Sequence, residues 1–168
     1  DTSGIKFQLG HYFREDWAIE AFYSQYSNSD NQAVKNLQEI NQSVPFIRRP
    51  EKIYGANVVW SPFYGKVNTF NSIFYFDWSF GLGFGSITTE SNAKTVSDSN
   101  TADQFESEKN LNIQTKTSFR FYATKEFHIE IELLRHNYRE KGPDFPDKPG
   151  RSAWRSLTDA TLSVGFSF

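Results

Sequence analysis

In the stretch IFYFDWSFGLGFG, from Ile73 to Gly85, apolar residues alternate from Phe74 onward with small, polar or tyrosine residues. One parity carries Phe74, Phe76, Trp78, Phe80, Leu82 and Phe84. The other parity carries Tyr75, Asp77, Ser79, Gly81, Gly83 and Gly85. A period of two is typical of a β-strand, because successive side chains of a strand point to opposite faces. The stretch therefore predicts a strand with one strongly apolar face.

The same alternation recurs in six further segments: residues 5–13, 17–23, 54–60, 111–121, 127–133 and 160–168. Short connections are expected near 14–16, 61–72 and 123–126, and long polar ones near 27–52, 86–109 and 136–153. No run approaches the roughly 18 apolar residues of a spanning helix. The pattern predicts one all-β domain over residues 1–168, built as a small antiparallel up-and-down barrel of about eight strands, seven of them readable.

The composition narrows the classes of protein that fit. The 168 residues include 17% aromatic and 23% charged residues, with a net charge of −2. This balance gives no electrostatic reason to expect a nucleic-acid partner. Cysteine is absent, which excludes disulfides, thiolate metal sites and cysteine nucleophiles. Methionine is absent even at position 1, so we expect the chain to begin after a processing event or to be a fragment.

The polar parity indicates which face of the strands lies inside. It is rich in Gly and Ser and carries a few charges of both signs, which suits the crowded interior of a narrow membrane barrel. The expected interior polar network is Lys6, Glu20, Asp77, Lys116, Arg120, Glu130, Glu132 and Asp159. The expected lipid-facing wall is Phe74, Phe76, Trp78, Phe80, Leu82, Phe84, Leu162, Val164 and Phe166. Alternating short and long connections favour an outer-membrane barrel, because such barrels have short periplasmic turns and longer external loops.

The number of readable strands leaves open how the wall of the barrel closes. Single-chain bacterial barrels have even strand numbers, and seven readable strands are one short. We expect an eighth strand upstream of Asp1. The alternatives are that a neighbouring chain closes the wall or that the first and last strands pair with each other.

Four segments resemble a known family. They are GIKFQLGHYFREDWAIEAFYSQYS (Gly4–Ser27), YGANVVWSPFYGK (Tyr54–Lys66), FDWSFGLGFG (Phe76–Gly85) and TLSVGFSF (Thr161–Phe168). Together they look like the outer-membrane β-barrel domain family of myxobacteria and Bdellovibrio-like predatory bacteria. The resemblance runs over nearly the whole chain and implies a barrel fold, a bacterial outer-membrane location and a further N-terminal strand. It implies no reaction, because the molecular function of that family is mostly unassigned.

The chain ends on LSVGFSF, from Leu162 to Phe168. A terminal aromatic of this kind resembles the signal that the barrel assembly machinery reads in bacterial outer-membrane proteins. The resemblance implies that Phe168, Phe166 and Val164 form an assembly signal as well as part of the wall.

Candidate chemistry is sparse. The histidines His11, His128 and His136 lack the spacing of a zinc site, and we expect no metal, cofactor or catalytic residues. An enzyme alternative would combine Ser118, His128 and Glu130, although no G-x-S-x-G motif is present. A separate basic group at the base of an external loop, Arg48, Arg49 and Lys52, could contact lipopolysaccharide phosphates.

These observations favour a structural or interaction role in the outer membrane. Small wall residues, Thr115, Thr117, Ala21 and Ala56, favour side-by-side assembly into a homo-oligomer that contacts or encloses lipid. The expected partners are membrane lipids, the barrel assembly machinery and further copies of the chain. One alternative is a narrow channel or an outer-membrane lipid enzyme that uses the inward charges. Another is a soluble lipocalin-like carrier with its aromatic residues inside.

Overall fold

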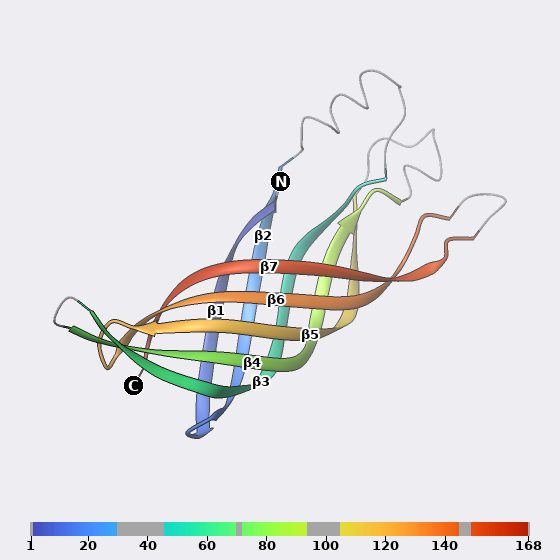
Figure 1. Cartoon of the computed structure of the whole chain (residues 1–168). Helices are drawn as coiled ribbons and strands as arrows, with labels where there is room; N and C mark the ends of the chain where they lie inside the picture. Colours follow the sequence, from blue (N-terminus) through green and yellow to red (C-terminus); the bar gives the residue numbers. More distant parts are fainter. Residues whose placement is uncertain (1, 30–45, 70–71, 94–104, 145–148, 168) are drawn as a thin grey trace.

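The computed structural model describes residues 2–29, 46–69, 72–93, 105–144 and 149–167. In these ranges the chain forms β1 (Thr2–Arg14), β2 (Trp17–Asn28), β3 (Arg48–Thr69), β4 (Ser72–Ser91), β5 (Glu106–Tyr122), β6 (Phe127–Lys141) and β7 (Ser152–Phe166). The strands lie in one sheet in chain order, and every neighbouring pair is antiparallel (Figure 1). The all-β, up-and-down prediction is confirmed.

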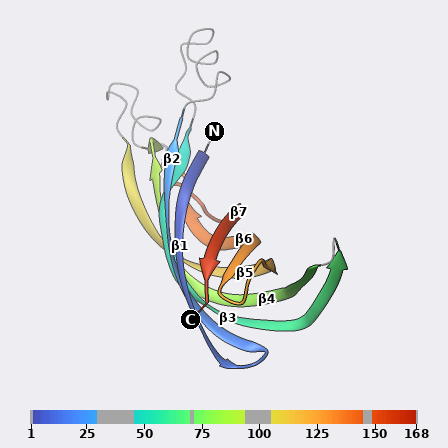
Figure 2. The same ribbon diagram turned by 90° about the vertical axis from the view of Figure 1, so that its left-hand side faces the viewer.

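The sheet is strongly twisted and curved. β1 and β2 run steeply across the direction of β5, β6 and β7 in Figure 1, and the view in Figure 2 shows the sheet bent into a trough. The right-handed twist of each strand accumulates over the sheet and brings its two ends toward each other. The edges β1 and β7 are not paired in the described sheet. The structure therefore has the curvature of a small barrel with an open seam, and the alternative in which β1 and β7 pair directly is not observed.

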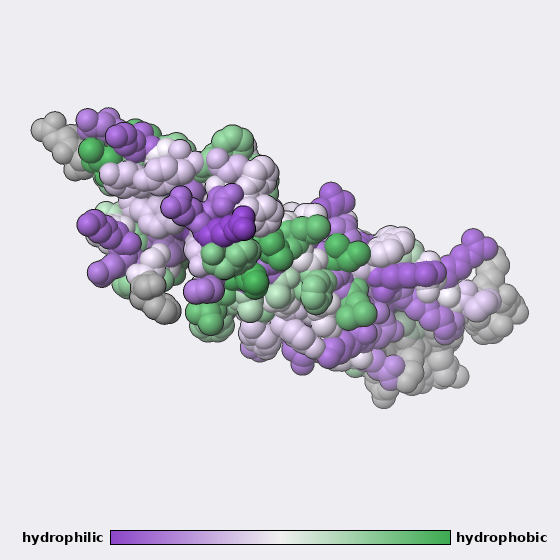
Figure 3. Space-filling model, turned by 90° about the horizontal axis from the view of Figure 1, so that it is seen from below, coloured by the Kyte–Doolittle hydropathy of each residue, from purple (hydrophilic) through white to green (hydrophobic). Residues whose placement is uncertain are grey.

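Burial in this sheet is the inverse of that in a soluble protein. Fully buried side chains on the inner face include charged residues, whereas large apolar side chains on the outer face are exposed: Lys116 is 3% exposed and Leu162 is 74% exposed. Figure 3 shows hydrophobic residues gathered in the middle of the surface seen from below, with hydrophilic residues toward both ends. The apolar parity of the strands therefore faces outward.

Several strands extend further than the alternation predicted. The segment 61–69 was expected in a short connection but belongs to β3, because pairing with β4 resumes after a bulge between Trp60 and Phe63. Pro62 lies in this bulge, where its missing N–H costs no ladder hydrogen bond. Parts of the expected long connections are also strand: 48–52, 86–91, 106–109, 136–141 and 152–153. These strand ends carry polar residues on both faces, so the alternation that marks the other strand residues is absent there.

Part of the interior is apolar, which corrects the expectation of a uniformly polar inner face. Phe22, Ile53, Ile87, Leu134 and Tyr138 form a buried cluster on the inner face. Phe22 interrupts the apolar parity of its segment in the sequence, and the structure explains this because its side chain points inward. The interior thus contains a charged region and, closer to the ends of the strands that carry the long connections, a small hydrophobic core.

Position 83, in the stretch Ile73–Gly85, must be glycine because β3 approaches its backbone closely. A Cβ atom at Gly83 would lie 2.0 Å from the carbonyl oxygen of Ala56 and 2.3 Å from Oδ1 of Asn57. These distances are far shorter than a van der Waals contact, and the first involves backbone. Gly83 therefore allows β3 to pass close to β4 with the Asn57 side chain lying over it.

Candidate functional site

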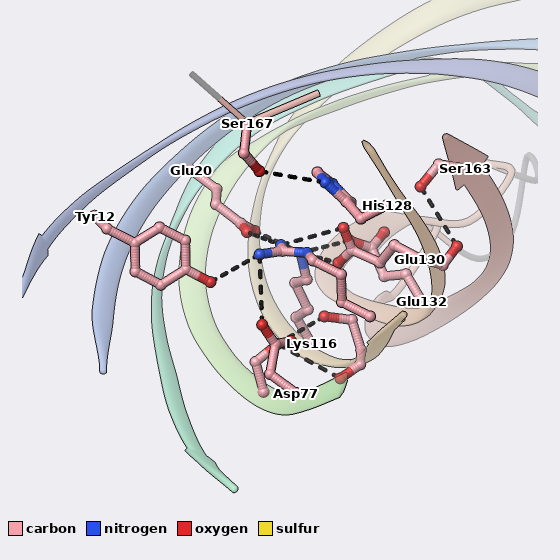
Figure 4. Close-up of polar contacts among 12 residues, drawn as sticks. Tyr12, Glu20, Asp77, Lys116, His128, Glu130, Glu132, Ser163 and Ser167 are labelled. Atoms are coloured by element: carbon pink, nitrogen blue, oxygen red, sulfur yellow. Dashed lines mark hydrogen bonds and ion pairs between the residues drawn. The ribbon is translucent and has the colours of Figure 1, made fainter. Parts of the chain in front are cut away.

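The charged residues that the sequence analysis expected in the interior come from six of the seven strands. Three cations, Lys6 on β1 and Lys116 and Arg120 on β5, face five carboxylates. The carboxylates are Glu20 on β2, Asp77 on β4, Glu130 and Glu132 on β6, and Asp159 on β7. All of them lie on the inward parity of their strands. The twist of the sheet turns their side chains toward one another, as Figure 4 shows for Glu20, Asp77, Lys116, Glu130 and Glu132. We call the group without Asp159 the interior network.

Lys116 lies at the centre of the interior network. Its Nζ contacts Glu20, lies 3.1 Å from Oε1 of Glu130 and lies 2.8 Å from Oε2 of Glu132. The Lys116 side chain is 0% exposed. Lys6 donates to the other carboxylate oxygen of Glu132. One ammonium therefore joins β2 to β6 across the interior, and the second joins β1 to β6.

Arg120 forms the other half of the interior network. Its Nη2 lies 3.3 Å from Glu130 and 3.5 Å from Glu20, and its Nη1 lies 3.9 Å from Asp77. Two tyrosines complete this region. Arg120 Nη1 donates to the Tyr12 hydroxyl at 2.8 Å, and the Tyr122 hydroxyl donates to Asp77 at 2.9 Å.

Asp159 belongs to a separate polar group. It accepts a hydrogen bond from the Tyr26 hydroxyl and lies 3.2 Å from Nε2 of His136. The other ring nitrogen of His136 lies 2.8 Å from Nδ2 of Asn112. This chain of contacts joins β2, β7, β6 and β5. It lies next to the buried apolar cluster, closer than the interior network to the strand ends that carry the long connections. The grouping of Asp159 with the three cations was therefore wrong in detail.

Sequence reasoning missed four of these residues: Tyr12, Tyr26, Tyr122 and His136. His136 was placed in a long connection, whereas β6 continues to Lys141 and buries it. The signal was available, since His136 has the same parity as Glu130, Glu132 and Leu134. No role was predicted for the three tyrosines, because a Tyr can lie on either face of a half-buried strand.

The interior network fills the space between the strands with ion pairs. An eight-stranded barrel is only wide enough for its own side chains, and here charged groups of opposite sign occupy that width. Buried charges are tolerated when they are paired and hydrogen-bonded. This arrangement can hold strands together across the interior. Lys116 and Arg120 each lie among three carboxylates, and Lys6 pairs with Glu132.

Ser118 and His128, which one enzyme alternative would combine, are not hydrogen-bonded to each other in the described structure. The Ser118 hydroxyl lies 2.7 Å from the Ser79 hydroxyl, whereas Nδ1 of His128 lies 3.4 Å from the Ser167 hydroxyl. Ser118 and His128 therefore have different partners. Among the described residues, no three His, Asp or Glu side chains are grouped so that they could hold a metal ion.

The residues expected to form the wall lie on the outer face. Phe74 and Phe76 are half-buried, and Phe76 stacks on the Phe119 and Phe121 rings. The other seven are exposed there: Trp78, Phe80, Leu82, Phe84, Leu162, Val164 and Phe166. Aromatic pairs mark the end that carries the short turns: Trp17 stacks on Trp60 and Phe127 packs against Phe166. Of the three residues expected as an assembly signal, Val164 and Phe166 lie on β7, and Phe168 lies outside the described residues.

The basic group at the loop base is largely engaged within the chain. Arg48 lies 2.6 Å from Glu140 and 3.1 Å from Glu108, and it covers the Phe46 ring. Arg49 lies over the Phe105 ring, and Lys52 lies 3.2 Å from Glu51. The charge of Arg48 is therefore neutralised by carboxylates of β5 and β6.

Two hydrogen bonds to Asp144 join residues on either side of the β6–β7 connection. The Lys141 ammonium donates to one oxygen of Asp144, and the N–H of Gly150 donates to the other. These two hydrogen bonds, that from Lys141 first, hold the pKa of the Asp144 carboxyl below its usual value.

The comparisons with known proteins find no counterpart: no family model, curated protein or solved structure matches the chain. Within the described ranges, no helix is both long and apolar enough to cross a membrane.

Proposed function

We propose that this chain is a small bacterial outer-membrane β-barrel with a structural or interaction role, rather than an enzyme. The observation that carries the proposal is the inverted distribution of side chains. Lys116, Glu20 and Glu132 are buried in ion pairs inside the sheet, whereas rows of Phe, Leu and Val are exposed outside it. Soluble proteins rarely expose apolar patches of more than a few hundred Å², so an apolar solvent around the sheet accounts for this surface.

The aromatic pairs and the strand lengths support a membrane position. Trp17 with Trp60 and Phe127 with Phe166 lie at the end of the short turns, as interfacial aromatic girdles do. The described strands have 12 to 22 residues, and about 9–11 tilted residues cross a bilayer. The remaining length extends the sheet toward the long connections, where both faces become polar.

The outer wall also supports contact with lipid or with a second copy. A shallow outer depression of about 270 Å³ is lined by Thr115, Thr117, Leu133, Arg135 and Thr158. Small side chains there leave room for a neighbouring barrel or a lipid chain, and the Arg135 guanidinium can pair with an acidic group. We propose that copies of the chain associate through β5, β6 and β7, with lipid held at this depression.

Fractionation tests the proposal. The protein expressed in a Gram-negative host is expected to enter the outer-membrane fraction, to require detergent for extraction and to migrate differently in gels before and after boiling. A lipocalin-like carrier would be extracted without detergent and would show no shift on boiling. Recovery in the soluble fraction as a folded β-protein would overturn the proposal.

Cross-linking in native membranes tests the interaction role. We expect dimers or higher oligomers, and we expect Thr117→Arg to reduce their amount. Thr2→Arg, on the edge strand β1, is the control and should leave the amount unchanged. A protein that remains monomeric before and after extraction in every mild detergent would contradict side-by-side assembly but not the membrane location.

A narrow channel is the second candidate, because carboxylates outnumber cations on the inner face and the buried Asp77 Oδ1 and Arg120 Nε atoms have no hydrogen-bond partner. Planar-bilayer recordings of the wild type, Arg120→Gln and Glu132→Gln separate the two functions. Absence of conductance in all three supports the structural role, whereas a cation conductance that changes in the variants supports the channel.

A further inference from the structure

Tyrosines gather on the inner face at the end of the sheet that carries the short turns. Four of the eight tyrosines of the chain lie there: Tyr12 on β1, Tyr64 on β3, Tyr75 on β4 and Tyr122 on β5. Tyr64 pairs with Asp77 across β3 and β4, and Tyr75 pairs with Tyr122 across β4 and β5, so these three tyrosines share the inward parity of Asp77. Tyr12 joins them through its contact with Arg120.

A bend in the sheet makes room between these rings. The last pair of β2 with β3 is Trp17 with Trp60, and beyond it the β3–β4 hairpin turns away from the rest of the sheet (Figure 2). The β1–β2 turn lies beside this bend, where the Ser61 N–H donates to the Asp16 carbonyl oxygen at 2.8 Å. Between the turn and the hairpin lies an open cavity of about 490 Å³, whose lining includes Tyr12, Tyr64, Tyr122, Glu15, Asp16 and Asp77.

The lining of this cavity combines aromatic rings with negative charge. Three tyrosines and three acidic residues contribute to it, and none of the described residues that line it is Lys or Arg. A cation over the face of a tyrosine ring is attracted by the quadrupole of the ring, and a nearby carboxylate adds a direct charge interaction. This composition favours a positively charged organic group in the cavity.

The nearby cations leave the cavity negative. Arg120 lies 3.9 Å from Asp77, but its guanidinium also contacts two glutamates of the interior network. That network pairs three cations with four carboxylates, and Glu15 and Asp16 add two more negative charges at the cavity. Lys125 lines an adjoining cavity of about 480 Å³ and not this one. The charge that would complement the site is therefore positive.

One oxygen of Asp77 has no donor. Asp77 is 6% exposed, and its Oδ2 accepts a hydrogen bond from the Tyr122 hydroxyl at 2.9 Å. Its Oδ1 is buried and has no hydrogen-bond partner among the described residues. A buried acceptor without a donor is costly, so this atom in the cavity wall indicates a ligand that donates. A primary ammonium carries three N–H donors, whereas a quaternary ammonium carries none.

We propose that this cavity binds a small primary ammonium cation, which donates to Asp77 and places its charge among the Tyr12, Tyr64 and Tyr122 rings. Tyr12 points from β1 into the interior in Figure 4, so its ring forms the wall opposite the hairpin. The cavity opens at the end of the sheet, where either a free amine or the ammonium headgroup of a lipid can enter. The site does not depend on the membrane location, because a soluble protein would carry the same cavity.

NMR titration of the protein, isotope-labelled in its tyrosine rings and held in maltoside micelles, tests the site with ethanolamine as the probe. We expect shifts of the Tyr12, Tyr64 and Tyr122 rings but not of Tyr23 on the outer face, with a dissociation constant on the order of 1 mM for so small a ligand. Choline, the trimethylated analogue, should bind about tenfold more weakly because it has no N–H for Asp77. Absence of ethanolamine binding, or equal binding of choline or of neutral ethylene glycol, would overturn the proposal.

Substitutions separate the ring from the charge. Tyr64 is 69% exposed, so its substitution should not disturb folding. Tyr64→Leu should weaken ethanolamine binding about threefold, whereas Tyr64→Phe keeps the ring and should bind like the wild type. Asp77→Asn should weaken it about tenfold, and Tyr23→Leu is the control that should change nothing. Unchanged affinity in Tyr64→Leu, or in a folded Asp77→Asn, would overturn the proposal.

Nanodiscs of two compositions distinguish the sources of the ammonium group. If the ligand is a lipid headgroup, phosphatidylethanolamine nanodiscs alone should shift the three tyrosine rings, and added ethanolamine should have no further effect. If the ligand is a free amine, ethanolamine should shift the rings equally in phosphatidylethanolamine and phosphatidylglycerol nanodiscs. Both results support the ammonium site, whereas no response to ethanolamine in phosphatidylglycerol nanodiscs would overturn it.

Discussion

Arg120 on β5 donates a hydrogen bond to the hydroxyl of Tyr12 on β1 at 2.8 Å, so two strands that are not neighbours in the sheet meet inside it. Sheet pairing alone could not produce this contact, since β2, β3 and β4 lie between the two strands in the order of the sheet. The contact exists because the sheet curves back on itself. It connects the edge strand β1 to the centre of the interior network.

Removing this hydroxyl should loosen β1. Tyr12→Phe deletes the acceptor while the aromatic ring remains, and a hydrogen bond to a charged group contributes about 1.5–3 kcal/mol. We expect the free energy of unfolding in urea and detergent micelles to fall by about that amount. Tyr64→Phe, at a tyrosine that is 69% exposed, is the matched control and should leave it unchanged. Equal losses in both variants would show that the Arg120 contact does not stabilise the sheet.

Removing the central cation should have a larger effect. Lys116→Met leaves Glu20, Glu130 and Glu132 facing one another without their shared ammonium, and breaking a buried ion pair in this way costs about 3–5 kcal/mol. Lys125→Met, in the exposed β5–β6 turn, is the control. Combining Lys116→Met with Glu20→Gln should recover part of the loss, because one unpaired carboxylate is removed. Equal stability of Lys116→Met and wild type would contradict the assigned network.

Gly83→Ala should disturb the pairing of β3 with β4. The added Cβ would meet the Ala56 carbonyl oxygen at 2.0 Å, and backbone has to move to relieve this contact. We expect a loss of about 1–3 kcal/mol, as for other overpacked sites. At Gly142, an added Cβ meets only the Arg151 carbonyl oxygen at 3.6 Å, so Gly142→Ala should be neutral. Thermal unfolding followed by circular dichroism measures both variants.

A charged side chain introduced on the outer face tests whether lipid or water surrounds that face. Leu162→Arg places a guanidinium on the wall several residues from the rim, and we expect a cost of about 2–4 kcal/mol if lipid covers this face. Phe166→Arg, beside Phe127 at the short-turn end, should cost only about 0–1 kcal/mol. If water covers the face, both changes should fall within about 0.5 kcal/mol of wild type. Unfolding in lipid vesicles distinguishes these results.

Lowering the pH should weaken the hydrogen bonds that Lys141 and Gly150 donate to Asp144. The pKa of Asp144 is lowered in the folded protein by the Lys141 and Gly150 hydrogen bonds, so the stabilisation exists above the unfolded pKa of about 3.9. It is lost as the pH falls through the lower, folded value. NMR titration of the carboxyl carbon should show a midpoint below that of an exposed Asp. Asp144→Asn should remove the pH-dependent change of the Gly150 amide chemical shift, because the neutral amide does not titrate. A midpoint at or above the ordinary Asp value would refute this assignment.

The alternation at Ile73–Gly85 was sufficient to predict strand, fold class and the facing of most residues, because parity is a local property of an extended chain. Strand ends were less predictable. At His136, for example, polar residues lie close by on both faces, and pairing with Gln114 of β5 and Leu157 of β7 keeps the chain extended. The bulge near Pro62 was missed for a similar reason, since the resumed ladder depends on β4.

The sequence by itself determined that this protein alternates on seven strands, with Gly, Ser and the interior charges on one parity and most of the Phe, Trp, Leu and Ile residues on the other. Only the tertiary structure decided which charges meet. Lys116 pairs with Glu20 across 96 residues of sequence and Asp159 pairs with Tyr26 and His136, because twist and curvature set the height of each strand in the interior. It also decided that β1 and β7 end as parallel edges on an open seam, since strand direction follows from the number of antiparallel steps between them.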